Sequence, residues 1–132
     1  MDMFDNHINQ FNHNKRFLSF GISNTKESFH DWEITVNFYA VIHLIEAILY
    51  KECNVATVRT HEERQNYIFT NSNVFSINVR KDYFALQTLA RTARYSGYLD
   101  VTEKDSLEAQ TRRESIEGEM AKYLKWLMNR IV

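Results

Sequence analysis

Apolar residues recur along most of the chain at the three- and four-residue spacing of amphipathic helices. The pattern predicts four long helices and one short helix, over about residues 3–20, 28–51, 61–70, 78–95 and 102–130. No segment is clearly patterned as a strand with a partner. The expected fold class is therefore all-α: an up-and-down antiparallel four-helix bundle with one additional short helix.

Several helix starts carry capping signals. Either Ser28 or Asp31 can cap the second helix. Thr60–Glu63 and Thr102–Asp105 have the spacing of capping boxes, in which the hydroxyl and the acidic side chain each accept a backbone amide hydrogen. Residues 108–115, in the first half of the last helix, are polar on every side, so we expect them to project into solvent or toward a partner.

The composition is that of one globular domain, covering residues 1–132. There is no proline and there are only three glycines, which favours long helices. The formal net charge of −1 argues against a surface that coats nucleic acid but leaves room for a local patch that contacts a few phosphates. Because Cys53 is the only cysteine, no internal disulfide can form. We expect a reduced, cytoplasmic location and no membrane association.

Polar side chains interrupt the most apolar run of the chain. His43 and Glu46 lie three residues apart on one face of the predicted central helix, and Tyr39 precedes them by one turn. A carboxylate in such a run needs a partner, because burying it alone is costly. One interpretation is a packed polar cluster that specifies the core, and the other is a polar, ligand-binding pocket between helices.

His61 and Arg64 share a face at the start of the short helix. Arg64 can hold a phosphate or carboxylate through two parallel hydrogen bonds, and a helix N-terminus favours the same anion. His61 could donate to that anion or act as a general acid or base, so these two residues are the candidates for catalysis as well as binding. The structural alternative is that they pair with Glu46 or Glu62.

Two other clusters have weaker functional interpretations. His43, Glu46, His61 and Glu62 have ligand types that suit zinc or iron, but the spacing departs from a di-iron bundle, so we expect no bound metal and no cofactor. Arg91, Arg94 and Tyr95 end the predicted helix over residues 78–95, where cations complement the helix dipole. Together with Arg80 and Lys81 these arginines could instead form a modest basic face.

Three segments resemble the HEPN domain family: "NFYAVIHLIEAIL" at residues 37–49, "THEER" at 60–64 and "LARTARYSGY" at 89–98. The resemblance covers roughly Asp31 to Tyr98. It implies a small helical bundle, commonly a homodimer, of a family whose members often act with nucleotidyltransferases in toxin–antitoxin pairs. Many members cleave RNA without metal, and others bind nucleotides or serve as interaction modules.

One departure from the family pattern changes the expected function. Ribonuclease members carry an arginine followed, after four to six residues, by a histidine, and no arginine here precedes a histidine at that spacing. The resemblance therefore favours a member without the nuclease motif, which binds a nucleotide or RNA phosphate near His61 and Arg64. The alternatives are a divergent metal-independent ribonuclease and a purely structural, antitoxin-like interaction protein. Whether the chain is an enzyme stays open at this point.

Overall fold

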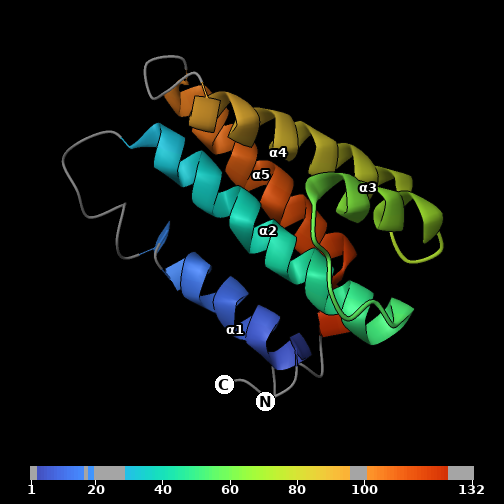
Figure 1. The fold of residues 1–132 in the computed structure, drawn as a ribbon. Coiled ribbons are helices and arrows are strands. Elements are labelled where there is room, and N and C mark those ends of the chain that lie inside the picture. Colours follow the sequence, from blue (N-terminus) through green and yellow to red (C-terminus); the bar gives the residue numbers. More distant parts are fainter. Residues whose placement is uncertain (1–2, 17, 20–28, 96–100, 125–132) are drawn as a thin grey trace.

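The computed structural model describes residues 3–16, 18–19, 29–95 and 101–124, and five main helices follow one another in this part of the chain (Figure 1). They are α1 (Met3–Arg16), α2 (His30–Cys53), α3 (His61–Thr70), α4 (Ile77–Tyr95) and α5 (Glu103–Glu119). No strand occurs among these described residues. The expected all-helical class is thus confirmed, and most helix ranges agree with the hydrophobic pattern to within a few residues. The last helix differs, because α5 ends at Glu119 with a turn at Met120, where the pattern predicts a helix that continues to about residue 130.

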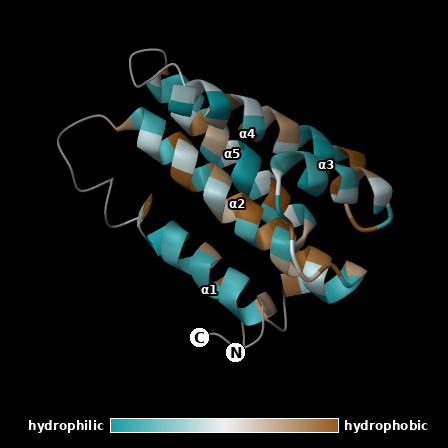
Figure 2. Cartoon of the chain, in the orientation of Figure 1, coloured by the Kyte–Doolittle hydropathy of each residue, from teal (hydrophilic) through white to brown (hydrophobic). Residues whose placement is uncertain are grey.

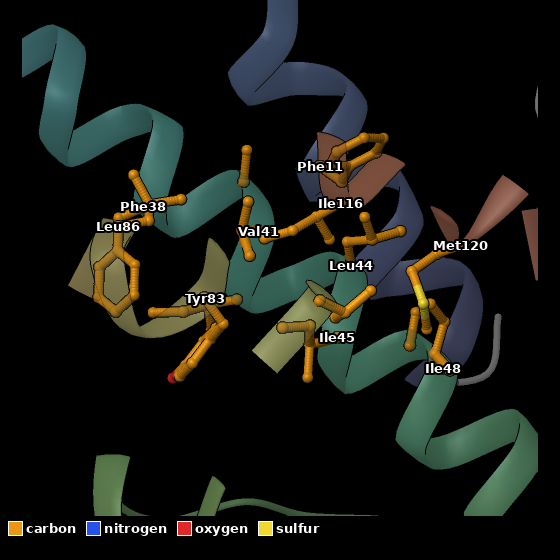
Figure 3. Close-up of a cluster of buried hydrophobic side chains, with 14 of the residues drawn as sticks. Phe11, Phe38, Val41, Leu44, Ile45, Ile48, Tyr83, Leu86, Ile116 and Met120 are labelled. Carbon is orange, nitrogen blue, oxygen red and sulfur yellow. The ribbon is translucent and has the colours of Figure 1, made fainter. Parts of the chain in front are cut away.

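Helix α2 lies at the centre because it is apolar around most of its circumference. It packs against α1, α4 and α5, while α4 also packs against α5. Figure 2 shows hydrophobic residues gathered along α2, and Figure 3 shows how its side chains meet those of the other helices. By length and composition α2 could cross a membrane, but the core helix of a soluble protein passes the same test, and 61% of its most apolar window is buried inside the protein.

The predicted stripes on the outer helices form the rest of the core. On α4 the whole stripe from Val79 to Ala93 is buried, as its alternating spacing predicts. On α1 the first three stripe residues are buried, namely Phe4, Ile8 and Phe11. Figure 3 shows Phe11 of α1 and Ile116 of α5 beside Leu44 of α2, so residues far apart in the sequence close one common core.

The helix ends confirm some capping predictions and correct others. Thr102 and Asp105 form the full capping box, whereas at α3 only half of the predicted box forms. Thr60 accepts from the amide of Glu63, but the Glu63 carboxylate accepts from the amide of Arg59 instead of Thr60. Of the two caps predicted for α2, Ser28 lies outside the described residues, and Asp31 was wrong because it lies within the first turn. Phe29 occupies the N-cap without a side-chain hydrogen bond.

The prediction that residues 108–115 project into solvent or toward a partner was wrong for one side of this stretch. Gln110, Thr111, Glu114 and Ser115 are exposed, but the side that faces the core is not. Ala109 and Arg113 are buried, and α5 packs along this stretch against α2 and α4. The Arg113 guanidinium donates from Nε to Asn37 of α2 and from Nη1 to Glu117 of α5, so two of its three nitrogens have partners inside the protein. Hydrophobic periodicity cannot detect such a contact, since it counts every arginine as solvent-facing.

Candidate functional site

The short helix α3 lies beside α2 and α4 because the connection over residues 54–60 folds back. Side-chain contacts fix its direction: Gln65 donates to Gln87, and the Phe69 ring stacks on Phe84 with centroids 5.1 Å apart. Residues later in α3 thus meet residues earlier in α4. This antiparallel arrangement brings the start of α3, at His61, to the last turns of α4 (Figure 1).

A mostly buried ion pair holds α3 against α2. Arg64 donates to Glu46 Oε1 from Nη2 at 2.8 Å and from Nε at 3.3 Å, and only 8% and 12% of the two side chains are exposed. Its remaining terminal nitrogen, Nη1, donates to His61 Nδ1 at 2.9 Å. Arg64, predicted as a ligand contact, is therefore occupied by protein partners on all three guanidinium nitrogens, and its role here is to position His61.

Two further histidines extend this network to α1. His7 Nε2 lies 3.4 Å from Glu46 Oε2, and His7 Nδ1 lies 2.8 Å from His43 Nδ1. Burial is the main cause that lowers the pKa of His7 and of His43, and the Arg64 charge acts in the same direction. His43 and Glu46 are thus linked within one polar network between helices, as the packed-cluster interpretation expected, with His7 as an additional member.

His61 is more exposed and stands among positive charges. Its ring stacks on Phe38 with centroids 6.0 Å apart and an interplanar angle of 29°. Burial lowers the pKa of His61, and the charges of Arg64, Arg94 and Arg91 lower it further. A pKa below the ordinary 6.5 favours the neutral imidazole at pH 7. Because a guanidinium only donates, Nδ1 is the acceptor and the proton of the neutral ring sits on Nε2.

Arg94 and its neighbours form an open basic face next to His61. The Arg94 guanidinium donates to the Tyr39 hydroxyl at 3.3 Å and lies over the rings of Phe38 and Tyr95, at 5.9 and 5.6 Å from their centroids. Tyr39 is 39% and Tyr95 80% exposed. We call the surface formed by His61, Arg91, Arg94, Tyr39 and Tyr95 the basic face.

The cations of the basic face have no acidic partners among the residues that the structure describes. None of the seven ion pairs found there involves Arg91, Arg94 or another residue of the basic face. Arg80, which the sequence suggested as part of the same surface, lies instead over the Phe69 ring at the other end of α4. The basic face is thus confined to the C-terminal end of α4, the start of α3 and the adjoining Tyr39 of α2.

The structure separates the five predicted site residues into two groups. Tyr39 and His61 border the basic face, whereas His43, Glu46 and Arg64 belong to the network behind it. Of the four residues that the sequence suggested as a metal set, His61 and Glu62 are not gathered with the other two in the described part of the chain. Comparisons with protein-family models, with curated proteins and with solved structures found no significant match.

Proposed function

We propose that this protein is an HEPN-like helical bundle that binds the phosphate group of a nucleotide or of single-stranded RNA on the basic face. The observation that carries the proposal is the convergence of Arg91 and Arg94, without acidic partners among the described residues, on the neutral ring of His61. A bound anion would compensate both charges, and guanidinium groups match phosphate geometry through paired hydrogen bonds.

The tautomer of His61 suits binding better than cleavage. Its Nε2–H can donate to a phosphate oxygen, while its only lone pair, on Nδ1, accepts from Arg64. A general base would need that lone pair free, and the Arg64 contact would have to break first. For this reason metal-independent RNA cleavage, with His61 as acid or base, is the second candidate and not the first.

Aromatic residues beside the arginines favour a nucleotide over inorganic phosphate. Tyr39 and Tyr95 are exposed, and the Arg94 guanidinium lies over Tyr95, so a planar base could stack on this surface. The basic face holds only two arginines and one histidine, which suits one or two phosphates and not a long duplex. We therefore do not expect this protein to bind along a long stretch of nucleic acid.

The partners belong to the same proposal. We infer a cytoplasmic homodimer that works beside a nucleotidyltransferase or another toxin–antitoxin component, because these are the associations that the HEPN resemblance implies. A purely structural, antitoxin-like role would leave the basic face without a ligand. The binding experiment described next therefore also tests that alternative.

Binding of adenosine monophosphate, adenosine triphosphate and a short single-stranded RNA can be measured by calorimetry on the wild type, Arg94→Ala and Lys81→Ala. Lys81 is an exposed cation on the same helix, about 20 Å from Arg94 along the axis, and serves as the matched control. We expect Arg94→Ala to weaken binding roughly tenfold, the usual effect of losing a charged hydrogen bond, and Lys81→Ala to leave it unchanged. Absence of binding, or equal affinities for all three proteins, contradicts the proposal.

A further inference from the structure

The polar network behind the basic face contains three metal-ligating side chains that come together from two helices. His7 lies on α1, and His43 and Glu46 lie one turn apart on α2. One potential ligand atom from each residue lies within 4.8 Å of the other two, and all three side chains are partly buried. We propose that His7, His43 and Glu46 form a binding site for Zn²⁺ that joins α1 to α2.

The donor set matches the chemistry of zinc. Two imidazoles and one carboxylate are the protein ligands of a well-known class of zinc site, in which a water occupies the fourth position. Two ligand atoms on one tetrahedral zinc ion, each bonded at about 2.0–2.1 Å, lie about 3.4 Å apart. The distance between the Nδ1 atoms of His7 and His43 is 2.8 Å, so the two rings need to separate by roughly half an ångström.

We expect side-chain rotation to complete the site, because the ligand atoms already lie within 4.8 Å of one another. The His7 ring now offers Nδ1 to His43 and Nε2 to Glu46, so a small turn of this ring lets one nitrogen face the ion while the ring stays between the same partners. The rings of His7 and His43 already lie with centroids 5.0 Å apart. Core residues beside the site, Ile8 of α1 and Leu44 of α2, keep the two ligand-bearing helices packed together.

Arg64 prepares the carboxylate for this role. It binds Oε1 of Glu46 and leaves Oε2, the oxygen that faces His7, free to coordinate. Metal-ligating carboxylates are commonly oriented by such hydrogen bonds from outside the coordination sphere. Arg64 thus contacts both the proposed zinc ligand Glu46 and His61 of the basic face. The zinc site and the phosphate site use different ligand atoms, so either can exist without the other.

The first test is metal binding by the full chain after dialysis against EDTA. Zn²⁺ is titrated by calorimetry, and Co²⁺ by its visible absorption, which is intense when the ion is four-coordinate. We expect one ion per chain and a rise of the melting temperature with Zn²⁺. His7→Ala and Glu46→Gln should lose the binding, whereas His13→Ala, which removes an exposed histidine of the same helix, should keep it.

A second measurement needs no variant and so does not depend on variants that fold. Zn²⁺ is added to the wild type and the histidine ring signals are followed by NMR. The proposal predicts that the signals of His7 and His43 move in step up to one equivalent while that of His13 stays in place. Absence of stoichiometric binding, or equal binding by His7→Ala and His13→Ala, would overturn it, and movement confined to other histidines would overturn it as well.

Discussion

Replacing Glu46 by glutamine tests whether the buried Arg64–Glu46 ion pair stabilises the fold. The substitution keeps the shape of the side chain but leaves the guanidinium, 8% exposed and unable to lose its proton, without a carboxylate. Breaking a buried ion pair on one side costs about 3–5 kcal/mol. Because the glutamine oxygen can still accept one hydrogen bond, we expect the lower end, about 3 kcal/mol of the free energy of unfolding.

The assay is urea denaturation with EDTA present, so that metal binding does not contribute. Glu108→Gln is the matched control: its carboxylate is 43% exposed and pairs with Arg112 four residues away, an arrangement worth about 0.3–0.5 kcal/mol. The double variant Glu46→Gln/Arg64→Met should recover part of the loss, because it removes the buried charge as well. If Glu46→Gln lowers the free energy of unfolding by less than about 1 kcal/mol, the pair contributes no more than an exposed one. That result would refute a stabilising role for the buried pair.

Two further predictions concern a helix start and the protonation of the site. Thr102→Ala removes the capping box of α5 and should lower the free energy of unfolding by about 1 kcal/mol in the same urea assay; no change would show that α5 is held by packing alone. The NMR titration midpoint of His61 should lie below 6.5 and rise in Arg94→Ala, since the Arg94 charge opposes the imidazolium. A pKa lowered by folding means that this group stabilises the protein above pH 6.5 and that the contribution is lost as the pH falls through the folded-state pKa. A midpoint that does not move in Arg94→Ala would contradict the placement of this arginine.

The helices could be predicted from the sequence because each carries its own periodic pattern. The stripe from Val79 to Ala93 defines α4 without any knowledge of its neighbours, and Thr102 marks the start of α5 through local capping chemistry. The side of α5 that holds Arg113 could not be predicted in this way. Its burial depends on Asn37, an acceptor 76 residues away in the sequence.

The site was predicted in part for the same reason. His61, Arg64 and Glu46 stand out as polar groups near an apolar run, and the structural alternative of an Arg64–Glu46 pair is the one that the structure contains. His7 was missed although it follows Phe4 by three residues and so borders the buried stripe of α1. The sequence left Arg94 between a helix-dipole role and a modest basic face, because only the folded chain brings it to Tyr39.

The central claim, that a phosphate ligand binds at the basic face, is tested most directly at the His61 ring. The ring signal is followed by NMR at pH 7 while adenosine monophosphate is added, with His13 as an exposed internal control. The account predicts a saturable shift of His61, together with a rise of its pKa as the bound anion offsets Arg91 and Arg94. A His61 signal that stays in place, or moves only as much as that of His13, would contradict it.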